Sequence, residues 1–178
     1  MARQLLILDL DETLFYAALS PRGRPPDFEL AGYSVYRRPF LQEFLDFAFE
    51  NFAVAVWSSA TEPYVRAAAR EVIARSADLQ FIWSMERCTR RFNGETREEY
   101  WVKDLKKLKR LGFSLDRVLV MDDSPEKHER NYGNLVPVRP FFGDQADTEL
   151  RDITPFLDRL QRCEDVRKIE KRNWRNWL

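Results

Sequence analysis

The sequence predicts an α/β protein in which an open parallel sheet is covered by helices. Four short apolar runs have the length and unbroken hydrophobicity of strands buried on both faces: residues 4–10, 53–57, 117–121 and 135–138. Segments with apolar residues at helical spacing lie between or after these runs. Strands and helices that alternate in this way build parallel sheets, because a helix carries the chain back to begin the next strand.

Length and composition predict one soluble domain over residues 1–178. This length suffices for a single core, and a hydrophobic fraction of 44% excludes a disordered chain. The 29 Lys and Arg residues balance 29 Asp and Glu residues, which argues against nucleic acid as a general partner. Asp9 and Asp11 interrupt the apolar N-terminal run, so we expect neither a membrane span nor a membrane partner.

Cysteine and histidine are scarce in this sequence. Cys88 and Cys163 do not form the dense pattern of a disulfide-linked secreted module, so an intracellular location is expected, cytoplasmic or, in a eukaryote, nuclear. A single histidine, His128, supplies neither a zinc site nor a Ser-His-Asp triad, and we predict it to be a surface or packing residue without a role. Carboxylates must therefore carry any chemistry.

The first half of the chain alternates strand and helix. After the first strand, prolines and a glycine predict a loop at residues 20–27. Pro39 begins a helix with apolar residues at helical spacing through Ala48. The strand at residues 53–57 follows, and the polar residues 58–63 are suited to begin a second helix.

The second half begins with a small β insertion, at about residues 81–102, in which Asn93-Gly94 predicts a hairpin turn. A basic amphipathic helix over 104–111 ends at Gly112. After the last two strands, a helix over 148–160 should break or restart at Pro155. Residues 162–178 form a basic terminal helix or tail that contains Trp174 and Trp177.

Three of the predicted strands end in side chains that can do chemistry. Asp9 and Asp11 follow the first strand, Ser58 follows the second, and Asp122-Asp123 follows the third. These groups should converge, because open α/β sheets bind ligands at the carboxyl ends of their strands. Four carboxylates would repel one another unless a cation lies among them, and Mg²⁺ suits such an oxygen site.

A carboxylate cluster that holds a metal favours phosphoryl transfer, and aspartate can act as the nucleophile that takes the phosphoryl group. Asp9 and Asp11 lie on the same side of an extended strand, so one can attack while the other moves a proton. Lys103 and Ser58 are the candidates for balancing and holding the phosphate.

Several motifs occur in an order that resembles one family. They are Asp-Leu-Asp-Glu-Thr-Leu (9–14), Tyr-Arg-Arg-Pro-Phe (36–40), Trp-Ser-Ser-Ala (57–60), Tyr-Trp-Val-Lys-Asp-Leu (100–105), Val-Leu-Val-Met-Asp-Asp-Ser-Pro (118–125) and Asp-Thr-Glu-Leu-Arg-Asp (147–152). From about Leu5 to Leu160 the chain resembles the NLI-interacting-factor-like phosphatases of the haloacid dehalogenase superfamily, which include RNA polymerase C-terminal-domain phosphatases. Motifs in a fixed order are far more specific than Asp-x-Asp-x-Thr alone.

The resemblance implies a catalytic role for each matching residue. Asp9 would be the nucleophile that becomes phosphorylated, and Asp11 would be the general acid and base. Thr13 would orient the loop that carries Asp11. Ser58 would bind the phosphoryl group, with Lys103 at the family's lysine position.

The resemblance also implies a metal site. Asp9, the backbone carbonyl of Asp11, and Asp123 would hold Mg²⁺, while Asp122 would support the site. Close relatives often carry asparagine at the position of Asp123. The residues alone do not decide whether Ser58 or Ser59 binds phosphate.

The fold implied by the resemblance is a Rossmann-like core with a small β insertion and no large cap. Such an open cleft admits a segment of a macromolecule, so phosphoserine or phosphothreonine in a protein is the expected substrate. A small phosphorylated metabolite, a nucleic-acid end or a non-catalytic phosphate-binding scaffold are the alternatives. Arg90 and Arg91 could contact substrate or solvent, and the sequence does not set the oligomeric state.

Overall fold

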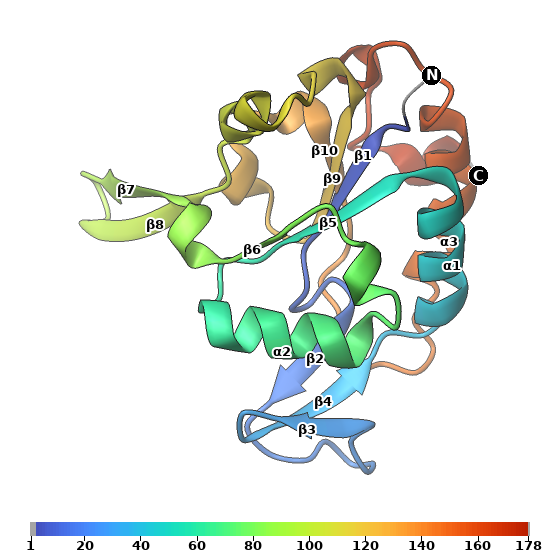
Figure 1. Cartoon of the computed structure of the whole chain (residues 1–178). Coiled ribbons are helices and arrows are strands. Elements are labelled where there is room, and N and C mark those ends of the chain that lie inside the picture. The colour runs from blue at the N-terminus through green and yellow to red at the C-terminus, as the bar shows by residue number, and fades with distance from the viewer. Residues whose placement is uncertain (1–2, 178) are drawn as a thin grey trace.

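A five-stranded parallel sheet forms the centre of the computed structural model, which describes residues 3–177 (Figure 1). Its order is β10-β9-β1-β5-β6, with β1 in the middle. The strands are β1 (Leu5–Leu8), β5 (Ala53–Trp57), β6 (Ile82–Trp83), β9 (Val118–Asp122) and β10 (Leu135–Pro137). The fold class and the four predicted strands are confirmed.

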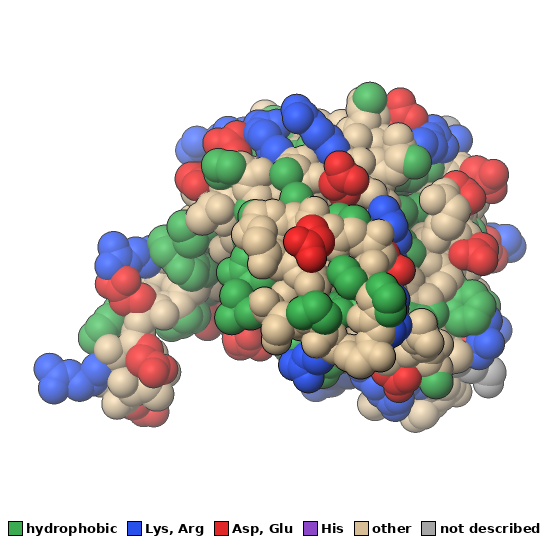
Figure 2. Space-filling view, turned by 90° about the horizontal axis from the view of Figure 1, so that it is seen from below, with side chains coloured by type: hydrophobic (Ala, Val, Ile, Leu, Met, Phe, Trp, Pro, Cys, Tyr) green, Lys and Arg blue, Asp and Glu red, His purple; other side chains and the backbone are tan. Residues whose placement is uncertain are grey.

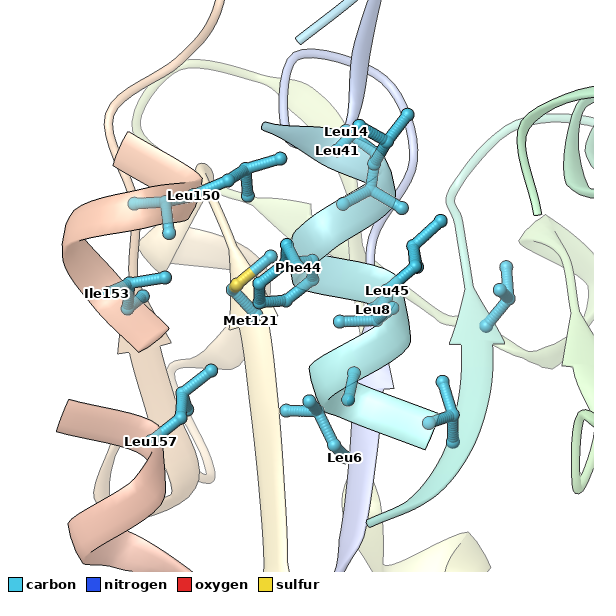
Figure 3. Packing of buried hydrophobic residues seen from close by; sticks show 14 of the residues in the cluster. Leu6, Leu8, Leu14, Leu41, Phe44, Leu45, Met121, Leu150, Ile153 and Leu157 are labelled. Atoms are coloured by element: carbon cyan, nitrogen blue, oxygen red, sulfur yellow. The ribbon is translucent and has the colours of Figure 1, made fainter. Parts of the chain in front are cut away.

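Alternate side chains of the central strands pack into two separate hydrophobic cores, one on each face of the sheet. Leu6 and Leu8 face the helices α1 (Leu41–Asn51), α2 (Glu62–Val72) and α3 (Glu149–Leu160). Figure 3 shows side chains of α1 and α3 meeting those of β1 and β9 on this face. Leu5 and Ile7 point to the opposite face, which is covered by Trp57, Trp83 and the 3₁₀ helix η3 (Leu105–Leu111). Strands buried on both faces explain why their sequences are continuously apolar.

Two predicted helices differ in form from the expectation. The helix expected to break at Pro155 is continuous, so that prediction is wrong. Pro155 lies on the exposed side of α3. Proline has no N–H, so one backbone carbonyl in the preceding turn lacks its helical partner, and water can donate a hydrogen bond to it instead. The segment after Asp104 adopts a 3₁₀ rather than an α form, and it ends at Gly112, whose φ is 84°.

A small antiparallel sheet, absent from the sequence prediction, follows β1. It contains β2 (Phe15–Ala18), β3 (Phe28–Leu30) and β4 (Tyr33–Arg37), in the order β2-β4-β3. The predicted loop at residues 20–27 is its connection between β2 and β3. Ala31 and Gly32 join β3 to β4 with φ values of 50° and 84°, the geometry of a tight hairpin turn.

The predicted hairpin exists and projects from the body as a narrow arm of mixed charge (Figures 1 and 2). It consists of β7 (Thr89–Asn93) and β8 (Glu98–Val102). The insertion is shorter than predicted, because Ile82 and Trp83 pair with β5 as part of the main sheet. The remaining 3₁₀ turns are η1 (Ser76–Asp78), η2 (Met85–Arg87), η4 (Leu115–Arg117), η5 (Pro125–His128) and η6 (Tyr132–Asn134).

The C-terminal segment is a tail rather than a helix. Its regular parts are the short 3₁₀ turns η7 (Val166–Lys168) and η8 (Trp174–Trp177). Trp174 is fully buried, donates a hydrogen bond from Nε1 to the carbonyl of Pro137 at 2.8 Å, and stacks on Phe156. The side chain of Trp177 lies outside the described residues. Over residues 3–177, helices are too short or too polar to span a membrane.

Candidate active site

The loop after β1 carries two of the predicted aspartates and is held rigidly. The N–H of Asp9 donates to the carbonyl of Met121, which keeps it beside β9. The chain then turns sharply through Glu12, whose φ is 59°. The buried Arg38 donates to the carbonyl of Thr13 at 3.0 Å and to Asp147 at 2.8 Å. This arginine therefore links the loop to Asp147 through its hydrogen bonds.

Three carboxylates meet where β1 and β9 end. One oxygen from each of Asp9, Asp122 and Asp123 lies within 4.8 Å of the others. Asp9 and Asp122 are buried and Asp123 is half-buried. A cluster of carboxylate oxygens is the donor set that Mg²⁺ takes in proteins, so these residues fit the predicted metal.

Lys103 connects two of these carboxylates from a fully buried position at the end of β8. Its Nζ donates to Asp9 Oδ1 at 2.7 Å and to Asp122 Oδ2 at 2.6 Å. Its backbone N–H donates to the carbonyl of Lys127 at 2.8 Å, so the lysine is anchored at both ends. One ammonium group thereby fixes the relative positions of two strand ends.

The three carboxylates of the cluster differ in how their surroundings shift their pKa values. Burial raises the pKa of Asp9, and the nearby Lys103 ammonium offsets only part of this increase. Burial also raises the pKa of Asp123, to about 7, and the Asp9 and Asp122 carboxylates add to the effect. Burial opposes the charge of Asp122 too, but Lys103 and a hydrogen bond from His128 hold the pKa of Asp122 well below its usual range. Asp122 therefore pairs with Lys103 as a carboxylate.

The Asp11 side chain is not a member of the group of three carboxylates and has a hydrogen-bond partner of its own. The Tyr64 hydroxyl donates to its Oδ1 at 2.5 Å. Burial raises the pKa of Asp11 to about 6, although the hydrogen bond from Tyr64 acts in the opposite direction. A carboxyl group with this pKa can both give and take a proton near neutral pH.

A groove of about 500 Å³ opens beside Asp11. Its walls include Ala17 and Tyr33 from the small antiparallel sheet and Tyr64 from α2. Tyr33 and Tyr64 meet edge to face, with 6.2 Å between ring centroids. The groove therefore places the Asp11 carboxyl group beside a partly apolar surface.

Two other predicted site residues lie in the segments that follow β1 and β5. Thr13 is buried, and its hydroxyl donates to Asp123 Oδ1 across a long 3.4 Å. Ser58 is also buried, at the end of β5, and its Oγ accepts the backbone N–H of Ala60 at 3.1 Å. Ser59 is half-buried at the next position.

His128 was missed as a site residue by the sequence prediction. It is fully buried, which rules out the surface alternative, and its Nε2 lies 2.8 Å from Asp122 Oδ2. The only sequence signal was its place in the turn that follows the Asp122-Asp123 pair. Arg38 and Tyr64 were likewise not singled out, since each reaches the site from a distant part of the chain.

Comparison with known proteins identifies the family. The family model for NLI interacting factor-like phosphatases matches residues 4–167. The chain belongs to this family. CTD nuclear envelope phosphatase 1 of Xenopus laevis is 29% identical over 96% of the chain and 72% of its own length. The human carboxy-terminal domain RNA polymerase II polypeptide A small phosphatase 1 is 31% identical over 92% of the chain and 62% of its own length.

A solved relative supports the fold. The fission yeast RNA polymerase II CTD phosphatase Fcp1, bound to beryllium fluoride, matches 89% of the chain with a TM-score of 0.60 and 19% identity. The chain spans about half of that structure, 50% of its length. The resemblance read from the ordered motifs is confirmed: the chain is an NLI interacting factor-like phosphatase.

Proposed function

We propose that the protein hydrolyses phosphoserine or phosphothreonine in protein segments, with Mg²⁺ as cofactor and Asp9 as the nucleophile. The observation that supports this best is the buried contact of Asp9 with Lys103, inside a group of three carboxylates. Lys103 orients the Asp9 carboxylate and balances its charge. A positioned carboxylate beside a cation is the arrangement that attack on a phosphate ester requires.

The reaction follows two displacements at phosphorus. A carboxylate oxygen of Asp9 forms a bond to phosphorus while the bond to the serine or threonine oxygen breaks, and Asp11 donates a proton to that oxygen. Water then attacks the aspartyl-phosphate, Asp11 takes its proton, and the bond between Asp9 and phosphorus breaks to release phosphate. The pKa of about 6 suits Asp11 to both transfers.

Asp9 and Asp123, together with the backbone carbonyl of Asp11, would hold the metal. Asp122 is less available, because Lys103, His128 and the N–H of Ser124 already occupy its oxygens. Bound Mg²⁺ would supply positive charge to the phosphate oxygens. Thr13 and the hydroxyl of Ser58 are proposed to orient the loop and the phosphoryl group.

The substrate proposal rests on the groove and on the relatives. The groove beside Asp11 is open, and its tyrosines can contact residues next to a phosphorylated side chain. The named relatives are CTD phosphatases, one of them of the nuclear envelope, which favours a phosphoprotein substrate and an intracellular location. A small phosphorylated molecule remains the second candidate, because an open site also admits one.

Activity assays on the purified chain test the proposal. Asp9→Asn should abolish hydrolysis of an aryl phosphate and of phosphopeptides, whereas the exposed, remote Asp46→Asn should leave it unchanged. Chelation should silence the enzyme, and Mg²⁺ should restore it. Turnover in Asp9→Asn, or in excess chelator, would refute the mechanism.

A panel of phosphopeptides, sugar phosphates and phosphorylated oligonucleotides, compared by kcat/KM, decides the substrate class. Preference for a phosphopeptide supports the proposal. Preference for a sugar phosphate or an oligonucleotide end contradicts it.

A further inference from the structure

His128 is buried beside the carboxylates of the candidate active site. It is the single histidine in the sequence and ends the turn Pro125–His128. Its side chain is 0% exposed, and its Nε2 lies 2.8 Å from Asp122 Oδ2. That same oxygen accepts the hydrogen bond from Lys103 at 2.6 Å. A continuous chain of contacts therefore runs from His128 through Asp122 and Lys103 to Asp9.

The surroundings define which nitrogen carries the hydrogen. An ionised carboxylate only accepts hydrogen bonds, so the ring nitrogen that faces Asp122, Nε2, must be the donor. Nδ1 is buried and has no hydrogen-bond partner among the described residues. The contact with Asp122 thus places a hydrogen on Nε2.

We propose that His128 is a positioning residue, whose Nε2–H holds Asp122 in the orientation that directs Lys103 toward Asp9. This inference rests on the proposed roles of Asp9 and Lys103. The imidazole occupies Asp122 Oδ2 together with Lys103, while the N–H of Ser124 holds Asp122 Oδ1. Lys103 can then share its hydrogen bonds between two carboxylates. Without His128, Oδ2 would lose one of its two donors, and Asp122 could draw the lysine away from the nucleophile.

Two substitutions separate positioning from packing. His128→Phe keeps a ring of similar size but removes the donor, and His128→Gln restores an N–H at about the same reach. His128→Phe should lower kcat for an aryl phosphate by about 10- to 100-fold with little change in KM, as is usual for residues that orient catalytic groups. His128→Gln should recover much of that loss.

The matched control is Asn134→Ala, in the same segment. Asn134 is buried, and its side chain donates to the carbonyls of Leu115 and Val118, away from the carboxylates. This variant should lower the melting temperature while leaving kcat per folded molecule unchanged. An unchanged kcat in His128→Phe, or no recovery in His128→Gln, would overturn the positioning role.

Nitrogen-15 NMR of the wild-type protein gives a measurement that needs no variant. A single histidine makes the ring signals unambiguous, and they should show a hydrogen on Nε2. A ring with hydrogen on Nδ1 alone would overturn the proposal, because Nε2 could not then donate to Asp122. Failure of the proposed function would be recognised differently, by an inactive wild type or by turnover in Asp9→Asn.

Discussion

Replacement of Tyr64 by phenylalanine tests whether Asp11 handles the proton. The Tyr64 hydroxyl donates to Asp11 Oδ1 at 2.5 Å, and the substitution removes that donor. The ring, which packs edge to face on Tyr33, is retained. The change is therefore confined to the charge balance of one carboxyl group.

The expected magnitude follows from that single contact. A hydrogen bond to a charged group contributes about 1.5–3 kcal/mol. Because about 1.4 kcal/mol corresponds to one pH unit, its loss should move the titration of Asp11 by about one to two pH units. The bond favours the carboxylate, which lowers the pKa of Asp11 against the effect of burial. Its removal must therefore shift the titration to higher pH.

The pH dependence of kcat with an aryl phosphate measures this shift. In Tyr64→Phe, the limb that reports ionised Asp11 should move to higher pH, so activity at mildly acidic pH falls most. Tyr33→Phe, in the same groove but without a hydrogen bond to Asp11, should keep the wild-type profile. An unchanged profile in Tyr64→Phe, or a shift to lower pH, would refute the assignment of Asp11 as acid and base.

Three further substitutions probe the metal, the buried lysine and the tail. Asp123, with a pKa raised by burial to about 7, must lose its proton to hold Mg²⁺. The Mg²⁺ affinity of the wild type should therefore weaken by up to about tenfold for each pH unit below that value. Calorimetry should find that the Mg²⁺ affinity of Asp123→Asn depends less on pH. Equal pH dependences in the two proteins would contradict this. Lys103→Met leaves Asp9 and Asp122 buried without their ammonium partner, so urea unfolding at neutral pH should show a loss of about 3–5 kcal/mol together with lost turnover. If Lys103→Met were as stable as the wild type, this would argue against a charged group of Asp9, Lys103 and Asp122. Trp174→Ala should cost about 3–5 kcal/mol without changing kcat per folded molecule, and an altered kcat would connect the tail to catalysis.

The strands were predictable because burial on both faces leaves a continuous apolar run, as in β1 and β9. The small sheet formed by β2, β3 and β4 was not. Its tightest turn places Ala31 at positive φ, where a sequence pattern would call for asparagine or glycine. The sequence left the C-terminal segment open as a helix or a tail, and the structure shows a tail. Trp174 is fixed by a hydrogen bond to Pro137 and by stacking on Phe156, tertiary contacts that replace helical periodicity.

The contacts of the site also fall into those that the sequence predicted and those that it did not. Asp9, Asp122 and Asp123 were predicted to meet because each sits at the end of a parallel strand, and the parallel register of β1 and β9 brings them together. Tyr64 reaches Asp11 from a helix 53 residues further along the chain. His128 faces Asp122 across a turn whose path is not set by any periodic pattern. Such contacts depend on packing and cannot be read from spacing.

The charges around Asp9 favour a divalent cation at the site. Asp9, Asp11, Asp122 and Asp123 bring four carboxylates to the site, against one buried ammonium, Lys103. Burial raises the pKa values of Asp9, Asp11 and Asp123, and neighbouring carboxylates add to the effect. His128 holds Asp122 in place through one hydrogen bond, so that Lys103 can bridge Asp122 and Asp9. A divalent cation would balance the negative charge that Lys103 leaves.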